Sequence, residues 1–107
     1  MVRFVGLDVH KRVVQAAILD GCGKLLAQKR FPGFRNDLEV FAKTTLTPDD
    51  HVVLEATTNC WEVVNILTPH VKRVVVSNPL ATKAIAYAKV KTDKIDARTL
   101  ADLLRCG

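Results

Sequence analysis

The segment VRFVGLDVHKRVVQAAILDGCGKLLAQKRF, residues 2–31, decides the fold that the sequence predicts. Residues 2–9 are mostly apolar at both odd and even positions, which is typical of a central strand covered on both faces. Residues 12–19 and 24–31 predict two further strands, because the turn signal Asp-Gly-Cys-Gly at 20–23 separates them. The segment therefore predicts two consecutive hairpins.

The rest of the chain alternates between helix and strand signals. We expect a helix with Asn36 as its N-cap that runs through Leu46, then a strand at 51–55 and a helix capped by Thr57 or Thr58 with Trp61 in the core. A strand at 72–76, a helix starting near Pro79 and a last helix over about 93–105 follow. Three antiparallel strands followed by this alternation predict a single α/β domain with a mixed five-stranded sheet and helices on its faces. The order matches the ribonuclease H-like layout, in which the first and fourth strands are parallel neighbours.

The composition is that of one globular domain. Of the 107 residues, 49% are hydrophobic and 25% are charged, and no apolar stretch is long enough to span a bilayer. The N-terminus lacks the layout of a signal peptide, and the three cysteines form no CxxC pair, so we expect a cytoplasmic protein with reduced thiols. The net charge of +5 is compatible with a polyanionic partner and equally with a lysine-rich surface.

Four acidic residues occupy positions that suit a metal site. Asp8 ends the run VRFVGLD and Glu55 ends the run HVVLE, while Asp93 and Asp96 follow as a pair in KTDKIDARTLADLL. A carboxylate at the end of a buried strand is costly to desolvate unless a counter-charge offsets it. Hard cations such as Mg²⁺ or Mn²⁺ prefer carboxylate oxygens, and one or two such ions can promote phosphodiester cleavage. The sequence therefore predicts a metal-dependent nuclease site.

The last predicted helix carries its two aspartates on its apolar stripe. At about 100° per residue, Asp93 and Asp96 share one arc with the leucines that would pack on the sheet, namely Leu100, Leu103 and Leu104. A solvated pair of acids would be expected among the basic residues of the opposite side instead. An alternative for Asp93 is that it only assists the first turn of the helix through the macrodipole.

Four blocks of sequence carry a resemblance to a known family. They are GLDVHK at 6–11, VVLEATTNCW at 52–61, VVVSNP at 74–79 and KTDKIDARTLADLL at 91–104. In this order they resemble the N-terminal DEDD domain of IS110-type transposases over essentially the whole chain, residues 1–107. The resemblance implies a resolvase-like domain whose catalytic and metal-binding tetrad is Asp8, Glu55, Asp93 and Asp96.

The resemblance also implies a biological role. Members of this family are recombinases that move insertion sequences by cutting and rejoining DNA, with Mg²⁺ at the acidic site. They act as oligomers and use a structured guide RNA encoded by the element to select DNA targets. A full-length member continues into a second domain that carries a serine proposed to attack DNA, so we expect this chain to be the catalytic N-terminal part of such a protein.

Basic residues near the acids are candidates for nucleic-acid contacts. Lys89, Lys91 and Lys94 surround the aspartate pair, and Lys11 follows Asp8 closely in the sequence. The alternative for Lys11 and its neighbour His10 is that they only begin a hairpin turn.

Other functions remain compatible with the acids alone. One is a stand-alone endonuclease of the Holliday-junction-resolvase type, and another is a non-catalytic fragment that binds nucleic acid or oligomerises. A sugar-kinase or actin-like ATPase lobe shares a related fold, but it needs a glycine-rich hairpin to hold phosphates. Here Asp8 is followed by Val9-His10-Lys11, so we set that function aside.

Overall fold

The computed structural model describes residues 2–10, 12–55, 60–77 and 97–106. The strands are β1 (Arg3–Val9), β2 (Val13–Leu19), β3 (Leu25–Pro32), β4 (Asp50–Glu55) and β5 (Arg73–Ser77). The helices are α1 (Arg35–Thr44), α2 (Cys60–Leu67) and α4 (Ala97–Arg105), and a short 3-10 helix, η1, covers Thr68–His70. The order of these elements follows the sequence prediction, and the helix expected near Pro79 lies outside the described residues.

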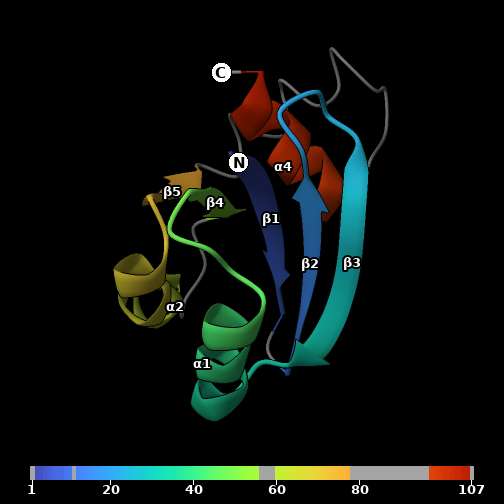
Figure 1. The fold of residues 1–107 in the computed structure, drawn as a ribbon. Helices are drawn as coiled ribbons and strands as arrows, with labels where there is room; N and C mark the ends of the chain where they lie inside the picture. Colours follow the sequence, from blue (N-terminus) through green and yellow to red (C-terminus); the bar gives the residue numbers. More distant parts are fainter. Residues whose placement is uncertain (1, 11, 56–59, 78–96, 107) are drawn as a thin grey trace.

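The five strands form one mixed sheet in the order β3-β2-β1-β4-β5 (Figure 1). β2 pairs antiparallel with both β1 and β3. β4 runs parallel to β1 on one side and to β5 on the other. The hairpins and the parallel neighbours β1 and β4 confirm the ribonuclease H-like architecture expected from the sequence.

One carboxylate and one glycine hold the turn between β2 and β3. Asp20 Oδ1 accepts hydrogen bonds from the backbone N–H of Lys24 at 2.9 Å and of Cys22 at 2.8 Å. The hydrogen bond from Lys24 is the main reason that the pKa of Asp20 lies below its ordinary value. Gly23 has a φ of 90°, in the left-handed region that favours glycine. The turn signal in the sequence therefore corresponds to a specific backbone conformation.

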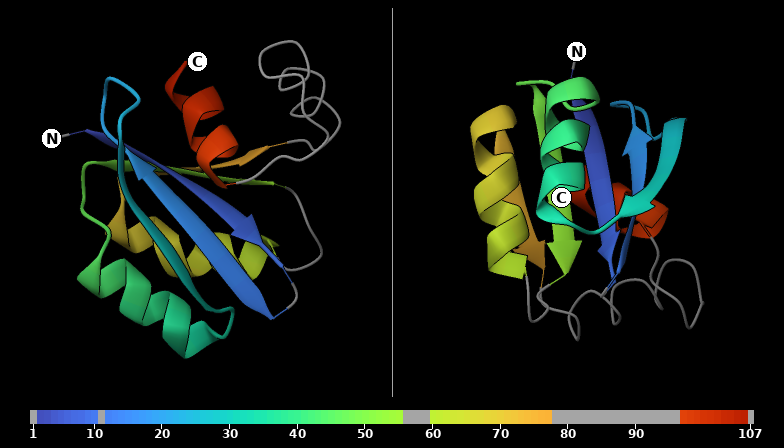
Figure 2. Two further views of the ribbon diagram at one scale, coloured as in Figure 1. Left: turned by 90° about the vertical axis from the view of Figure 1, so that its right-hand side faces the viewer. Right: turned by 90° about the horizontal axis from the view of Figure 1, so that it is seen from below.

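Helices cover both faces of the sheet (Figure 2). On one face, α1 and α2 enclose the larger core, to which β1 contributes Val5 and β4 contributes Val52. On the other face, Leu100 of α4 packs with Val53 in a smaller core. Because successive side chains of a strand point to opposite faces, a strand covered on both sides must be apolar at both parities. This explains the apolar runs of the central strands.

Trp61 lies outside the core, so the prediction that placed it there is wrong. The side chain is 67% exposed, whereas Val63 and Leu67 of the same helix are buried. At 100° per residue, Trp61 falls on the side of α2 opposite to these two residues. The sequence pattern indicated an amphipathic helix correctly but assigned the large aromatic residue to the wrong side.

Helix α1 also differs from its expected bounds. The helix begins after Phe34, where the backbone N–H of Leu38 donates to the Phe34 carbonyl at 3.0 Å. Asn36 therefore lies in the first turn and is not the N-cap residue, and the helix ends at Thr44 instead of Leu46. Backbone hydrogen bonds, without a side-chain cap, set the start of this helix.

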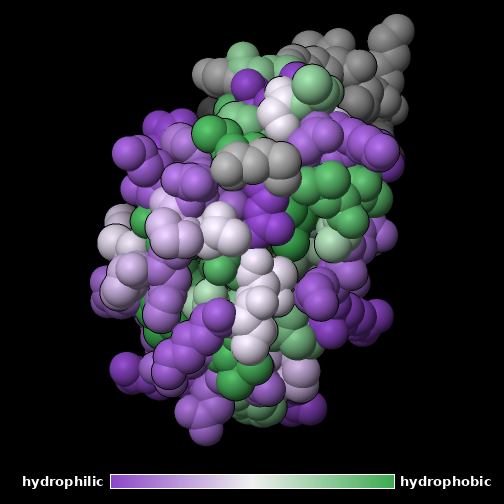
Figure 3. All heavy atoms as spheres, in the orientation of Figure 1, coloured by the Kyte–Doolittle hydropathy of each residue, from purple (hydrophilic) through white to green (hydrophobic). Residues whose placement is uncertain are grey.

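Hydrophilic side chains cover most of the face shown in Figure 3, with smaller hydrophobic groups between them. The large apolar side chains that are exposed include Val2, Leu26, Phe34, Val40 and Trp61. Within the described ranges, no helix has the length and apolar character needed to cross a membrane.

A buried ion pair ties the start of β1 to the start of β4. Asp50 is fully buried, and its carboxylate accepts hydrogen bonds from Arg3 Nε at 2.8 Å and Arg3 Nη2 at 2.7 Å. Thr47 donates to the same carboxylate through its backbone N–H at 2.8 Å and its hydroxyl at 2.9 Å. Burial raises the pKa of Asp50, but the hydrogen bonds from Arg3 and Thr47 outweigh it, so the pKa lies below the ordinary value of 3.8.

Replacing Asp50 with alanine leaves the Arg3 guanidinium, which is only 17% exposed, without its carboxylate partner. Removing one member of a buried pair costs about 3–5 kcal/mol, and we expect a loss near the lower end in the free energy of unfolding, measured with urea. The control is Asp102→Ala, which breaks a more exposed pair with Arg105 and should cost less than about 1 kcal/mol. Equal losses in the two variants would contradict this role.

The lowered pKa of Asp50 predicts how stability depends on pH. A carboxyl group with a lower pKa in the folded state binds more protons when unfolded, so it stabilises the fold above its unfolded pKa. The difference in unfolding free energy between wild type and Asp50→Asn should be constant near neutral pH and shrink as the pH falls through 3.8 and below. Urea unfolding at a series of pH values measures it, and a difference that grows on acidification would refute the prediction.

Candidate active site

One row of side chains crosses the sheet at the edge where β1 and β4 end. The last paired residues of the β1–β4 ladder immediately precede Asp8 and Glu55, so these two acids lie level with each other. Asp8 is paired with Gln15 of β2, and Glu55 is paired with Ser77 of β5. Four polar residues thus follow one another across four neighbouring strands, which are spaced about 4.8 Å apart.

The row lies on the face of the sheet that α4 covers. Val53, two residues before Glu55, packs with Leu100 of α4. Gly6, two residues before Asp8, lies directly against the backbone of α4. Because residues two apart in a strand share a face, Asp8 and Glu55 project on the same side as α4. This is the geometry that the sequence predicts for the two strand-end acids.

The lack of a side chain at Gly6 lets α4 approach β1 closely. A Cβ atom at this position would lie 2.7 Å from the backbone nitrogen of Ala101 and even closer to the carbonyl oxygen of Ala97. Both are main-chain atoms, which cannot rotate away as a flexible side chain could. Ala97 directly follows Asp96 in the sequence. The close contact therefore places the start of α4 beside the strand that carries Asp8.

His10 is the described neighbour of the Asp8 carboxylate. His10 Nε2 lies 3.1 Å from Asp8 Oδ2, and the Asp8 side chain is only 13% exposed. The backbone N–H of His10 donates to the carbonyl of Val13 at 2.9 Å, which closes the connection between β1 and β2. His10 therefore begins the hairpin turn, as one of the two interpretations predicted, and also contacts the candidate site.

The structure brings together two members of the predicted tetrad, Asp8 and Glu55. The other two acids and the four candidate lysines lie outside the described residues: Asp93, Asp96, Lys11, Lys89, Lys91 and Lys94. Among the residues that the structure does describe, there is no group of three or more His, Cys, Asp or Glu that could hold a metal ion. A complete metal site therefore stays a prediction.

Sequence reasoning did not place Gln15 or Ser77 beside the acids. Gln15 is the one uncharged polar residue in RVVQAAIL, and Ser77 ends the run VVV at 74–76. A polar residue within or just after an apolar run was the available signal in both cases. The strand order was also needed, because it decides which of these residues are neighbours.

Two partly buried carboxylates on adjacent parallel strands suit a shared cation. Asp8 and Glu55 carry like charges at a separation of about one strand spacing, so a cation or hydrogen-bond donors must offset their repulsion. Divalent hard cations bind to such oxygens together with water and substrate phosphates. The described edge can hold part of a cation site, and further oxygen ligands from another segment would complete it.

The sheet order and the strand-end acids define a ribonuclease H-like α/β domain. The structure is similar to the crystal structure of a ROK hexokinase from Thermus thermophilus, with a TM-score of 0.55 and 18% identity. The match covers 84% of this chain and 38% of that one, so the chain spans well under half of that protein, and the likeness concerns the fold alone. A comparison with curated proteins finds no match.

The sequence matches the model of the IS110-type DEDD transposase family over residues 5–107. The chain therefore belongs to this transposase family, as the four sequence blocks indicated. Members of the family typically use divalent metals.

The contact at Gly6 predicts that even a methyl group there is destabilising. Gly6→Ala should lower the free energy of unfolding by about 1–3 kcal/mol, because the added carbon overlaps main-chain atoms of α4. Urea unfolding measures the loss, and hydrogen exchange should show faster exchange in α4. Gly21→Ala is the matched control, since no atom lies within 4 Å of its added carbon. Unchanged stability in Gly6→Ala would show that α4 does not pack this closely.

Proposed function

We propose that Asp8, Glu55, Asp93 and Asp96 form the catalytic tetrad of a DNA recombinase and bind one or two Mg²⁺ or Mn²⁺ ions. The observation that supports this most is the alignment of Asp8 with Glu55 on the face where α4 begins, directly after Asp96. The fold thus links Asp8 and Glu55 to one edge of the sheet, and the sequence links Asp96 to the helix that begins beside that edge.

The packing of α4 supports the inclusion of the aspartate pair. At helical spacing, Asp93 and Asp96 share the stripe of Leu100, which is 1% exposed and packs against Val53 of β4. That stripe faces the sheet. On our proposal, the two aspartates that precede α4 in the sequence supply the remaining ligands at the edge where the strand-end acids lie.

The residues of this chain have distinct tasks in the proposed reaction. The ladder between β1 and β4 holds the strand-end carboxylates at fixed positions, which a metal site requires. His10, 3.1 Å from Asp8 Oδ2, restricts the orientation of that carboxylate. A bound divalent cation would supply stabilisation of negative charge on the oxygens of a phosphodiester. The overall charge of +5 favours the approach of a polyanion.

We further propose that Lys11, Lys89, Lys91 and Lys94 contact the phosphate backbone. Their support is their position in the sequence, close to Asp8 or around the aspartate pair. Lysine ammonium groups that neutralise phosphates release counterions, so such contacts make binding strongly dependent on salt.

The family relationship supports a wider assignment. We propose that residues 1–107 act as the DEDD catalytic domain of a recombinase that also has a C-terminal domain, works as a homo-oligomer and takes its target from a structured guide RNA. Each of these features rests on the family resemblance.

Calorimetric titration of Mn²⁺ tests the tetrad. Wild type should bind the ion saturably, and Asp93→Ala/Asp96→Ala should weaken binding at least tenfold, because half of the proposed ligands are lost. Asp8→Asn, which removes charge without changing size, should have a similar effect. The matched control is Asp37→Asn in α1, on the opposite face of the sheet, which should leave binding unchanged.

Equal Mn²⁺ binding in all variants, or none in wild type even with DNA present, would refute the metal site and favour a fragment that only binds nucleic acid or oligomerises. A cleavage assay separates the enzymatic alternatives. Metal-dependent cutting of branched DNA by the chain alone would indicate a resolvase-like endonuclease, whereas strand cutting and rejoining at element ends would indicate the recombinase.

A further inference from the structure

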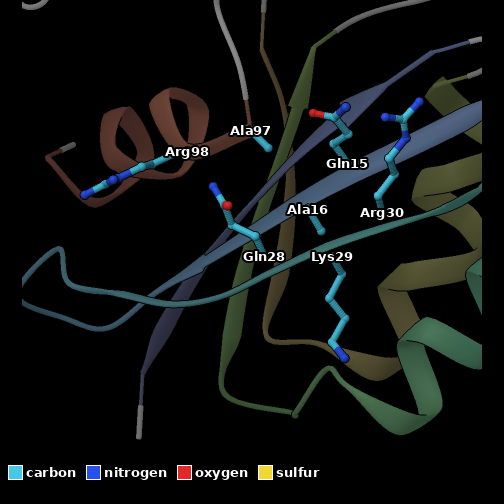
Figure 4. Close-up of a pocket in the computed structure, with 7 residues that line it drawn as sticks. All are labelled: Gln15, Ala16, Gln28, Lys29, Arg30, Ala97 and Arg98. Atoms are coloured by element: carbon cyan, nitrogen blue, oxygen red, sulfur yellow. The ribbon is translucent and has the colours of Figure 1, made fainter.

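A second polar site lies next to the acidic row, between β2, β3 and the start of α4. It is a hollow of about 270 Å³ (Figure 4). Its polar lining includes Lys29 of β3 and four side chains from three elements: Gln15 of β2, Gln28 and Arg30 of β3, and Arg98 of α4. We call these four residues the Gln–Arg patch. No acidic residue lines the hollow within the described part of the chain.

The Gln–Arg patch continues the acidic row across the sheet. Arg30 is paired with Gln15, and Gln15 is paired with Asp8, so all three side chains lie on the face that α4 covers. Two strand spacings, about 10 Å, separate Arg30 from Asp8. In Figure 4, Gln15 and Arg30 lie at one end of the hollow, Arg98 lies at the other, and Gln28 lies between them. The hollow therefore leads toward the candidate active site.

The positive charges of the patch are not neutralised by nearby acids of the described residues. Among the described residues, the arginines that form ion pairs with acids are Arg3, Arg35 and Arg105, all outside the patch. Neither Arg30 nor Arg98 takes part in such a pair. The side chains of Arg30 and Arg98 are both exposed. Their guanidinium groups are thus available to an anion from solution, and their planar donor geometry matches a phosphate.

A comparison with the hollow between α1 and α2 shows that charge, and not size, distinguishes the patch. That hollow is larger, about 530 Å³, and its lining includes the bases Arg35 and Lys43. It also includes the acids Glu39 and Glu62, and Arg35 Nε lies 3.5 Å from Glu39 Oε1. A site with both signs does not select a polyanion, whereas the Gln–Arg patch carries only positive charge and neutral amides.

We propose that the Gln–Arg patch binds the phosphodiester backbone of the nucleic-acid strand that enters the acidic site. This inference rests on the proposed function, because the acidic row defines where the strand leads. The carboxylates of Asp8 and Glu55 repel a polyanion, and the two arginines offset that repulsion beside them. Arg30 and Arg98 hold phosphate oxygens, while the amides of Gln15 and Gln28 donate to phosphate or sugar oxygens. Such contacts position a strand without reading its bases.

Binding of a fluorescently labelled single strand to the full chain, measured by anisotropy over a range of salt concentrations in EDTA, tests the proposal. Arg30→Gln/Arg98→Gln should weaken binding at least tenfold and lower the salt slope by about 1.4, since each phosphate contact to a single strand contributes about 0.7. Arg30→Lys/Arg98→Lys keeps the charge, so it should restore most of the slope but less of the affinity, because lysine lacks the planar fork.

The matched control is Lys43→Gln/Lys72→Gln, which removes the same charge at two exposed positions outside the patch, in α1 and just before β5. It should leave the salt slope within error of wild type. An equal loss in this control, or no loss in the arginine variant, would overturn the proposal. Thermal unfolding confirms that each variant is folded.

DNA and RNA strands of the same sequence identify the source of the phosphates. A larger loss with DNA assigns the patch to the substrate strand and supports the proposal. A larger loss with RNA would assign the patch to a guide strand and overturn the proposal that it binds the strand entering the acidic site. Because EDTA removes divalent cations, this experiment is independent of the metal titration. The metal titration can therefore refute the tetrad while the binding experiment supports the patch, and the opposite combination is equally distinguishable.

Discussion

The parallel ladder between β1 and β4 is the constraint on which the rest of the structure depends. At one end of the ladder, Arg3 and Asp50 form a buried, hydrogen-bonded ion pair. At the other end, the same register brings Asp8 level with Glu55. A slip of one residue would turn every side chain of one strand to the opposite face and separate the two acids. The ion pair is therefore a structural feature that also fixes the geometry of the candidate site.

The close approach of α4 to Gly6 joins the fold to the chemistry. Because Gly6 has no side chain, the start of α4 lies on β1, two residues from Asp8. The same approach forms one wall of the hollow that contains Arg30 and Arg98. The edge that we propose binds a cation and the patch that we propose binds phosphates thus adjoin each other. A hexokinase shares the fold, so the sheet by itself does not determine what this transposase-family chain does, and our proposal assigns that role to the residues at this edge.

Local patterns predicted the elements well and their details less well. The turn at 20–23 and the two hairpins were predicted because their signals lie within a few residues of one another. The stripe of Leu100 was predicted because helical phase is a local property. Trp61 was misplaced because it was grouped with the apolar residues of the same helix, although helical phase places it opposite to the buried Val63 and Leu67. The start of α1 was misplaced because backbone hydrogen bonds, and not a capping side chain, begin it.

The sequence by itself determined the strands, the turns, the family and the positions of the strand-end acids, because each follows from neighbouring residues or from short motifs. The tertiary structure alone decided that Gln15, Arg30 and Ser77 share one line with Asp8 and Glu55. Strand order and register arise from pairing between segments far apart in the chain. A local pattern tells which face a side chain occupies, but only the pairing of the strands tells which side chains become its neighbours.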